Sequence, residues 1–406
     1  MRVDDVSGMG TVAIHAGRWE TAEHAHITPI FATSAYTFDS AEQGMNRFSG
    51  KEAGFTYSRF GNPTVAAAAQ LIEALEAFNL KNERGEPLQV KALLHASGQA
   101  AMATMFLSNL SAGDAVLSGR SVYGGTYEFL QNLISRFGIR SRFADMRDLS
   151  NLADILSHDP TIKLVHLETP ANPTMQCTDM EAVCKLAKQF NCLVTADNTF
   201  ATPYLQQPFQ YGVDFVFHST TKFLNGHGSA IGGVLIGRDG ELMNKRVTQT
   251  FKLLGSNSNP FDAFLLIQGV KTLAVRMDRH CSNALAVARF LSAHPAVAVV
   301  NYNGLPSHPD HAVSCKQMKQ HGAVLSFELE GGYESAVRFI DKLRICVRAV
   351  SLGTVDTLVS HPASMSHAGM LRAEREAAGI SDGLIRMSVG LEDISDLLSD
   401  LDQALL

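Results

Sequence analysis

Short apolar runs alternate with amphipathic stretches along the middle of the chain. The runs predict buried strands at residues 91–95, 115–117, 164–167, 192–196, 213–217 and 231–236. Between them, apolar residues recur with helical spacing at residues 64–78, 98–110, 126–137 and 180–190. Strands that alternate with amphipathic helices of this length predict a parallel, doubly wound α/β sheet.

The pattern changes near residue 260. A long helix is expected at 261–291, followed by strands near 297–302 and 323–329, which indicates a smaller α+β region. The first 63 residues are polar and rich in turn signals, which favours an arm over a separate domain. We therefore expect three parts: an N-terminal arm (1–63), a large domain (64–260) and a smaller C-terminal domain (261–406).

Composition excludes several classes of protein. The chain has 406 residues, of which 46% are hydrophobic and 18% charged, which is enough for one large and one smaller domain, each with its own hydrophobic core. A net charge of −6 without a basic block gives nucleic acids and anionic membranes nothing to bind. No apolar run approaches the roughly 18 residues that a membrane span needs, and the N-terminus lacks a signal pattern.

Cysteine and histidine usage gives little reason to expect a metal. The six cysteines show neither zinc-ligand nor disulfide-framework spacing, which is typical of a reduced, cytoplasmic protein. His308 and His311 are close in sequence, but a polar loop explains them better than a metal site. We therefore expect no bound metal ion.

Two charged residues follow neighbouring buried strands. Lys222 closes the segment after the run at 213–217, and Asp197 directly follows the run at 192–196. An unpaired buried charge is costly, so such residues need a partner or a chemical role. Pyridoxal phosphate (PLP) needs both groups, because a lysine forms its Schiff base and a carboxylate keeps its ring nitrogen protonated. The pair therefore suggests a PLP site.

An anion site and a stacking residue are expected nearby. Gly98 lies between a strand and a helix, where the first free N–H groups of the helix favour a phosphate. Ser219 and Thr221 flank the turn before Lys222 and add hydroxyl donors. Tyr123 precedes two glycines after a strand and offers a flat face to a flat ring.

Ordered motifs over nearly the whole chain also carry a family resemblance. The sequence resembles the PLP enzymes of cysteine and methionine metabolism, which include cystathionine γ-synthase, cystathionine γ-lyase, methionine γ-lyase and the acylhomoserine sulfhydrylases. The matching segments are YSRFGNPT (57–64), ASGQAAM (96–102), VYGGTY (122–127), ETPANPT (168–174), ADNTFATPYLQ (196–206), HSTTKFLNGHG (218–228), SLG (351–353), HPASMSHAG (361–369) and GLIRMSVGLED (383–393).

The resemblance implies the fold of fold-type I PLP-dependent transferases and a role for each matched residue. Lys222 would hold the cofactor and then move protons, and Tyr123 would stack on the ring and donate a proton to the leaving group. The implied cofactor-binding residues are Lys222, Asp197, Tyr123, Gly98, Gln99, Thr199, Ser219, Thr221, Tyr57 and Arg59. The implied substrate-binding residues are Arg386, which would grip the α-carboxylate as a bidentate clamp, with Ser351 and Asn172 close by.

In this family the arm with Tyr57 and Arg59 completes the phosphate site of the neighbouring subunit. The resemblance therefore implies a homotetramer built from two dimers that share active sites.

The resemblance leaves two reactions open, γ-elimination and γ-replacement. The MDRH and RMSVGLED segments look like methionine γ-lyase, yet that enzyme usually has a cysteine where this chain has Gly125 and a Lys-Asp pair near Lys252. The PFDAFLL (260–266) and SHAGM (366–370) segments look like cystathionine γ-synthase, which typically has an arginine near Glu128. We expect γ-elimination slightly ahead of γ-replacement on an acylhomoserine or the cystathionine γ-lyase reaction. Transamination and a non-catalytic protein are weaker alternatives.

Overall fold

The computed structural model describes residues 6, 8–365, 371–377 and 379–406. The start of the predicted arm (residues 1–5 and 7), the SHAGM segment (366–370) and the end of the HPASMSHAG motif (366–369) lie outside the described residues.

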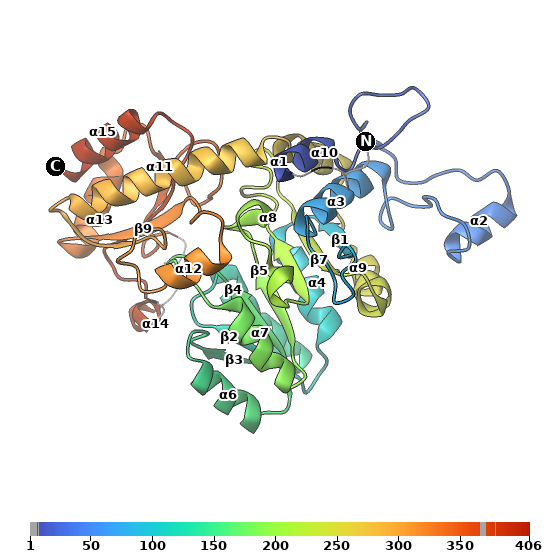
Figure 1. Ribbon diagram of the computed structural model, residues 1–406, viewed down its shortest axis with the longest axis horizontal. Coiled ribbons are helices and arrows are strands. Elements are labelled where there is room, and N and C mark those ends of the chain that lie inside the picture. Colours follow the sequence, from blue (N-terminus) through green and yellow to red (C-terminus); the bar gives the residue numbers. More distant parts are fainter. Residues whose placement is uncertain (1–5, 7, 366–370, 378) are drawn as a thin grey trace.

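A seven-stranded sheet forms the centre of the larger part of the molecule (Figure 1). The strand order is β1-β7-β6-β5-β4-β2-β3, and β7 is the one strand of this sheet that runs antiparallel to its neighbours. The strands are β1 (Val90–His95), β2 (Ala115–Gly119), β3 (Arg140–Ala144), β4 (Ile162–Glu168), β5 (Leu193–Asp197), β6 (Phe215–His218) and β7 (Gly233–Arg238). The predicted mostly parallel sheet is confirmed.

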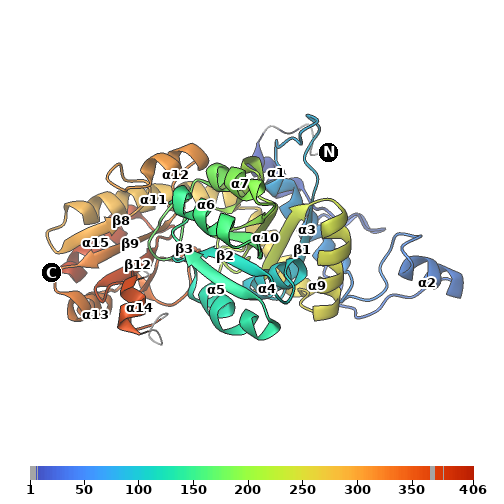
Figure 2. The ribbon, with the colours of Figure 1, turned by 90° about the horizontal axis from the view of Figure 1, so that it is seen from below.

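Helices cover both faces of this sheet, as Figures 1 and 2 show. In β4, Leu164 packs into one apolar core and Val165 into the other, so the strand is buried on both sides. The core that contains Val165 includes α3 (Pro63–Glu76), α6 (Leu149–His158), α7 (Met180–Gln189) and α8 (Thr202–Leu205), with the 3₁₀ turn Pro208–Tyr211. The core that contains Leu164 includes α4 (Gly98–Asn109), the π-helical turn Leu242–Val247 and α9 (Thr248–Leu254). The sheet is therefore doubly wound.

Two predicted helices are interrupted. The helix expected at 126–137 consists of α5 (Gly124–Glu128), a π-helical turn at Phe129–Leu133 and a 3₁₀ turn at Ile134–Phe137. Phe129, Leu130 and Ile134 are all buried in one core, so packing overrides regular α-helical geometry there.

The helix expected at 261–291 is divided into α10 (Pro260–Val270) and α11 (Leu273–Ala293). The buried guanidinium of Arg276 donates from Nη2 to the carbonyl of Gly269 at 2.8 Å and from Nη1 to that of Phe223 at 2.8 Å. A Cβ at Gly269 would lie 2.1 Å from the carbonyl oxygen of Asn225, so this glycine lets the segment after Lys222 pass close to α10.

A second sheet of five strands, in the order β10-β11-β12-β9-β8, lies beside the first. All its pairs are antiparallel except β10 with β11. Its strands are β8 (Val297–Asn301), β9 (Val324–Leu329), β10 (Val347–Arg348), β11 (Leu358–Ser360) and β12 (Leu384–Ser388), accompanied by α12 (His311–Gln317), α13 (Gly332–Lys342), α14 (Arg372–Ala377) and α15 (Ile394–Leu405). The long α11 runs from the first sheet to the second (Figure 1).

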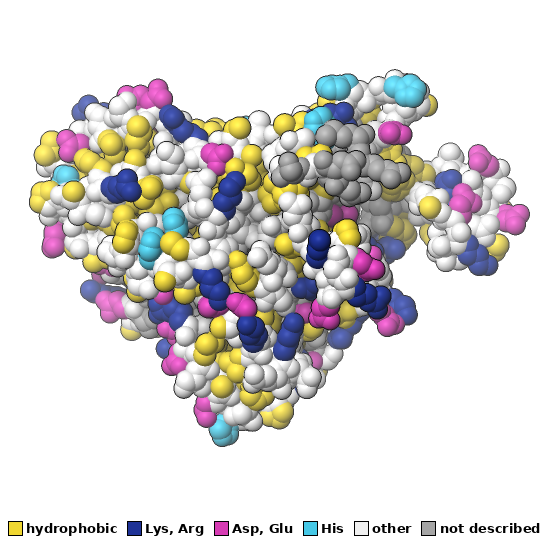
Figure 3. Space-filling view, in the orientation of Figure 1, with side chains coloured by type: hydrophobic (Ala, Val, Ile, Leu, Met, Phe, Trp, Pro, Cys, Tyr) yellow, Lys and Arg dark blue, Asp and Glu magenta, His cyan; other side chains and the backbone are white. Residues whose placement is uncertain are grey.

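The two helices of the N-terminal segment differ in how they pack. α1 (Met9–His15) packs against α3 and α11 and buries Val12 and Ala13 in the main core. α2 (Ala41–Phe48) instead projects away from the rest of the chain, as Figures 1 and 3 show. The boundaries at residues 63 and 260 remain predictions.

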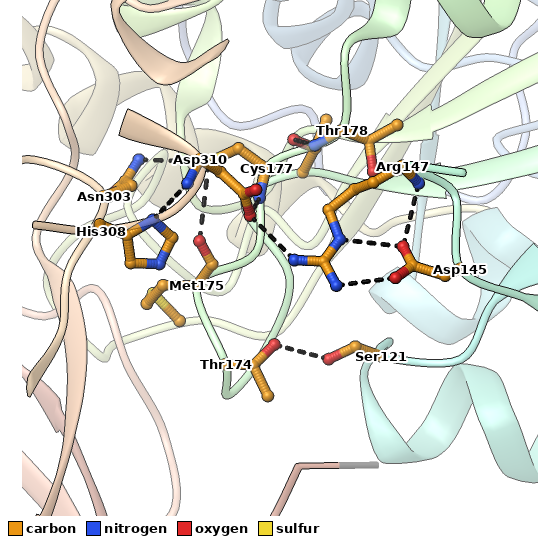
Figure 4. A network of polar contacts seen from close by, with 11 residues as sticks. Ser121, Asp145, Arg147, Thr174, Met175, Cys177, Thr178, Asn303, His308 and Asp310 are labelled. Carbon is orange, nitrogen blue, oxygen red and sulfur yellow. Dashed lines mark hydrogen bonds and ion pairs between the residues drawn. The ribbon is translucent and has the colours of Figure 1, made fainter. Parts of the chain in front are cut away.

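A polar network joins the two sheet regions (Figure 4). Asp310, just before α12, accepts a hydrogen bond from the backbone N–H of Cys177 at 2.9 Å. Arg147 lies between two carboxylates, with Asp145 at 2.7 Å and Asp310 at 3.5 Å. The side chains of Ser121 and Thr174 hydrogen-bond nearby at 2.7 Å. These contacts fix the loop after β4 against the segment that leads into α12.

Within the described part of the chain, no helix is both long enough and apolar enough to cross a membrane.

Candidate active site

Three polar residues end three neighbouring parallel strands at one edge of the large sheet. Glu168 ends β4, Asp197 ends β5 and His218 ends β6, and Glu168 and Asp197 are register partners. Lys222 follows His218 in a turn in which its N–H donates to the carbonyl of Ser219 at 3.2 Å. The carboxyl edge of such a sheet is where doubly wound proteins bind ligands. The structure thus brings Lys222 and Asp197 to the same edge.

Thr199 connects Asp197 to the turn that carries the lysine. Both the backbone N–H (3.0 Å) and the hydroxyl of Thr199 donate to Oδ1 of Asp197. The hydroxyl oxygen of Thr199 in turn accepts the N–H of Ser219 at 2.9 Å. Burial raises the pKa of Asp197, and this carboxyl is in no ion pair among the described residues. It is therefore a half-buried acid that lacks an ion-pair partner among the described residues.

Glu168 lies next to Asp197 and positions the neighbouring loops. Its carboxylate accepts the backbone N–H of Tyr123 at 2.7 Å and that of Asn172 at 2.9 Å. Burial, followed by the charge of Asp197, raises the pKa of Glu168 to about 8. The nearby charge of Asp197 therefore favours the protonated form of Glu168.

Ser351 joins Lys222 to Arg386. The Nζ of Lys222 donates to the Ser351 hydroxyl at 2.9 Å, and Nη2 of Arg386 donates to the Ser351 carbonyl at 2.9 Å. Nη1 of Arg386 lies 3.4 Å from the side-chain oxygen of Asn172. Burial and the nearby Arg386 charge lower the pKa of Lys222 to about 8, and burial lowers that of Arg386 to about 10. Arg386 and Ser351 therefore bring the second sheet to the lysine.

The first turn of α4 abuts the turn before Lys222. A Cβ at Gly98 would lie 2.9 Å from Cβ of Ser219, so the glycine permits this close approach. The side chain of Gln99 donates to the carbonyl of Gly125 at 3.0 Å, which ties α4 to the loop that carries Tyr123. Tyr123 itself is 49% exposed and so stands at the mouth of the site. A helix N-terminus faces the same region as the amine.

Three predicted cofactor-binding residues have other contacts in the single chain. The Thr221 hydroxyl oxygen accepts the N–H of Gly232 at 3.0 Å and lies 3.2 Å from its carbonyl oxygen. Arg59 donates to the carbonyl of Lys252 and lies over the rings of Tyr57 and Phe60. Tyr57 and Arg59 are exposed and, among the described residues, share no hydrogen bond with the group around Lys222. Their predicted roles remain predictions.

The residues around Lys222 fit PLP. Asp197 is a half-buried acid without an ion-pair partner among the described residues, and Lys222 has an amine whose pKa is already lowered. The Nε of Arg386 is buried without a hydrogen-bond partner, which suits a carboxylate ligand. Lys222 would hold the cofactor, Asp197 would pair with its ring nitrogen, and the α4 N-terminus with Ser219 would bind its phosphate.

Buried residues to which the sequence analysis assigned no role hold the segments that carry this site. Arg276 holds the carbonyls of Phe223 and Gly269, which fixes the chain just after Lys222. His218 pairs through Nε2 with Glu76 of α3, and both side chains are fully buried. No local sequence pattern marks these residues, because their partners lie far away in the sequence. Glu168 was detectable in principle, because it follows a predicted strand as Asp197 does.

Comparisons with known proteins agree with this geometry. A family profile for Cys/Met metabolism PLP-dependent enzymes matches residues 10–406. The chain is 43% identical to an L-methionine gamma-lyase of Fusobacterium nucleatum subsp. polymorphum over 98% of both chains, and 39% identical to an O-succinylhomoserine sulfhydrylase of Pseudomonas aeruginosa over 97% of this chain and 94% of that one. A crystal structure of cystathionine gamma synthase from Xanthomonas oryzae pv. oryzae, in complex with aminoacrylate and cysteine, has a TM-score of 0.90 and 37% identity over 98% of both chains. This chain therefore belongs to the Cys/Met metabolism family of PLP-dependent enzymes.

Proposed function

We propose that this enzyme catalyses γ-elimination on methionine or a similar sulfur amino acid, releasing a 2-oxo acid, ammonia and a thiol. The observation that carries the proposal is the junction of Lys222 and Arg386 through Ser351, which brings a proton-accepting amine next to a carboxylate-binding guanidinium. The 43% identity to a methionine γ-lyase over nearly all of both chains favours elimination within the family.

Each side chain has a distinct task in this proposal. Arg386 binds the substrate α-carboxylate, because its planar fork matches the two carboxylate oxygens. Lys222, with a pKa lowered to about 8, has a substantial uncharged fraction near neutral pH and accepts the proton from the substrate Cα. PLP, when bound, supplies the electron sink that stabilises negative charge at that carbon. The hydroxyl of Tyr123 donates a proton to the sulfur that leaves from Cγ.

The second candidate function is γ-replacement on an O-acylhomoserine or the cystathionine γ-lyase reaction. The observation in its favour is the geometry at Gly125, where a Cβ would lie 2.5 Å from Cε1 of Tyr123 and 2.8 Å from Nε2 of Gln99. A cysteine, which methionine γ-lyases usually have at this position, therefore requires the tyrosine to move. Because this chain has Gly125, it lacks the thiol that methionine γ-lyases usually have near the tyrosine. This difference favours the second candidate function.

A substrate panel separates the candidates. Purified enzyme would be given methionine, cystathionine, O-acetylhomoserine or O-succinylhomoserine, each with and without added thiol. Release of ammonia and 2-oxo acid from methionine without thiol supports the proposal. A thioether that forms only from an acylhomoserine and thiol, with methionine inert, would replace it by γ-replacement.

Replacing Arg386 with lysine should lower kcat/KM by about 10- to 150-fold, because a charge-assisted bidentate contact is worth about 1.5–3 kcal/mol and lysine cannot reproduce its geometry. Steady-state kinetics with the full substrate and with its analogue lacking the carboxyl group would measure this. The variant should lose most of its preference for the carboxylate, whereas Arg289→Lys, an exposed arginine on α11, should keep it. An unchanged preference in Arg386→Lys would contradict the clamp.

We further propose that the chain forms a homotetramer of two dimers that share active sites. The projecting α2 segment exposes large apolar side chains that a single chain leaves in water, among them Met45 (59%), Phe48 (65%) and Tyr57 (41%). Exposed apolar side chains gathered on one segment are typical of a protein–protein contact. The arm would thereby deliver Tyr57 and Arg59 to the phosphate in the neighbouring subunit.

Replacing Arg59 with alanine should weaken PLP binding by about 10- to 150-fold, because it removes a charged hydrogen bond to phosphate worth about 1.5–3 kcal/mol. Cofactor retained after dialysis, read from absorbance, measures the loss. Arg338→Ala removes an exposed arginine on α13 and should leave retention unchanged. Full retention and full activity in Arg59→Ala would contradict the shared site.

We also propose a cytoplasmic location. The six cysteines are all unpaired thiols, and five of them are buried, which suits a reducing compartment.

A further inference from the structure

Three side chains of a metal-binding kind meet on the surface near the second sheet, and none of them belongs to the candidate active site. His311 and Cys315 lie one helical turn apart on α12, and His321 lies in the loop before β9. One ligand atom of each lies within 4.8 Å of those of the other two. The Nε2 of His311 is 3.5 Å from Sγ of Cys315, so the three already converge on one point.

Hydrogen bonds hold both imidazoles in place. Nδ1 of His311 lies 2.9 Å from the carbonyl oxygen of Asn303, and because a carbonyl only accepts, Nδ1 carries the proton. The lone pair of a neutral His311 ring is then on Nε2, the atom that faces Cys315. Nδ1 of His321 hydrogen-bonds with the Ser314 hydroxyl at 2.8 Å, which holds this ring in place. Metal-binding histidines are typically fixed in this way by a bond at the other nitrogen.

An ion from solution can reach these atoms. Cys315 is exposed, whereas the other five cysteines are buried. Figure 3 shows histidine side chains gathered at the surface over α12. Neither His311 nor His321 takes part in an ion pair within the described residues, so no carboxylate competes for them.

We propose that His311, Cys315 and His321 form a zinc site, with a water molecule as the fourth ligand. Two imidazole nitrogens and one thiolate suit Zn²⁺, and tetrahedral ligands at about 2.0–2.3 Å from the ion lie about 3.3–3.8 Å apart. Separations of at most 4.8 Å need only small side-chain movements to reach that geometry. On binding, the Cys315 thiol releases its proton to solvent as its sulfur bonds to the metal.

The sequence offered no reason to expect this site. His308 and His311 are neighbours in the SHPDH segment, which we expected to be a polar loop without metal. In the fold, Nδ1 of His308 instead accepts the N–H of Asp310 at 3.2 Å within the network of Figure 4. The ligand set becomes visible only when α12 and the loop after it place His321 beside His311, with ring centroids 5.3 Å apart.

Occupancy of the site would stabilise the contact between the two sheet regions. The same helix places Lys316 2.8 Å from Asp179, and Gln317 donates to the carbonyl of Thr178 at 3.1 Å. Zinc would fasten α12 to the loop before β9 and so hold these contacts in place. A ligand that binds the folded state alone raises stability.

Thiol protection in the metal-free holoenzyme tests the site without reference to turnover. Native protein would be alkylated with iodoacetamide, with and without Zn²⁺, and Cys315 modification followed by peptide mass spectrometry. Zinc should slow alkylation of Cys315 at least about tenfold. His311→Ala and His321→Ala should abolish that protection, whereas His158→Ala, an exposed histidine on α6, should keep it.

Cobalt substitution gives an independent measurement. Co²⁺ added to the holoenzyme should produce the visible absorption of a tetrahedral thiolate site in a difference spectrum, and Cys315→Ser should lose it while keeping the cofactor absorbance. The proposal is overturned if zinc leaves wild-type Cys315 equally reactive, or if protection persists in both histidine variants. It does not depend on which reaction the active site performs.

Discussion

Replacing Lys222 with alanine is expected to reduce kcat by about 10³-fold or more, because the variant loses the group that holds the cofactor and accepts the substrate proton. The structure supports this magnitude. Lys222 is half-buried, its pKa is lowered to about 8, and its Nζ donates to Ser351, which also contacts Arg386. In the described structure, no other lysine has such a position.

Borohydride reduction and peptide mass spectrometry would measure the covalent role. Wild-type protein should carry a fixed cofactor mass on the peptide that contains Lys222, and Lys222→Ala should carry none. Lys185→Ala, an exposed lysine on α7 paired with Glu181, should retain both the label and the activity. A label that remains in Lys222→Ala on another peptide would mean that a different lysine holds the cofactor.

Replacing Asp197 with asparagine should reduce kcat by about 10²- to 10³-fold, comparable to the loss of one preorganised electrostatic contact. Asparagine keeps the shape and can still accept from Thr199, but it has no charge to hold a proton on the ring nitrogen. Glu168 accepts the backbone N–H groups of Tyr123 and Asn172 and so is already engaged with the neighbouring loops.

Reconstitution with a PLP analogue methylated at the ring nitrogen separates charge from structure. This analogue is permanently cationic, so it should restore part of the activity of Asp197→Asn and none of the activity of Lys222→Ala. Asp154→Asn, at an exposed position of α6, should behave as wild type. If the analogue gives no recovery in Asp197→Asn, the carboxylate has a role other than keeping the ring charged.

Much of the large sheet was predictable, since its strands are buried on both faces and therefore appear as continuous apolar runs. β3 was missed because its burial alternates, with Arg140 and Arg142 exposed at the edge of the sheet. α6 was missed although its buried Leu152 and Leu156 have helical spacing. β10 and β11 are too short for any periodicity to show.

The approach of Asp197 and Lys222 at one sheet edge was predictable, because each follows a buried strand. Its supporting contacts were not, because they join distant segments: Glu76 with His218, Arg276 with Phe223, and Ser351 with Lys222. Nothing local marks a residue whose partner is 50 or more positions away, as in all three pairs. Such contacts depend on tertiary packing, which the hydrophobic periodicity of the sequence does not specify.

An arm that completes the active site of the neighbouring subunit, as proposed for the projecting segment with α2, has a genetic consequence. Consider two chains altered in different places, one by Lys222→Ala and the other by Arg59→Ala. Alone, the first would lack activity, and the second would lose much of its activity as it loses cofactor. In a dimer that contains one chain of each variant, one active site would combine the intact Lys222 of one chain with the intact Arg59 of the other. The second active site would contain both substitutions. Co-expression of the two alleles would then restore a fraction of wild-type activity, a complementation that a self-contained monomer has no means of showing.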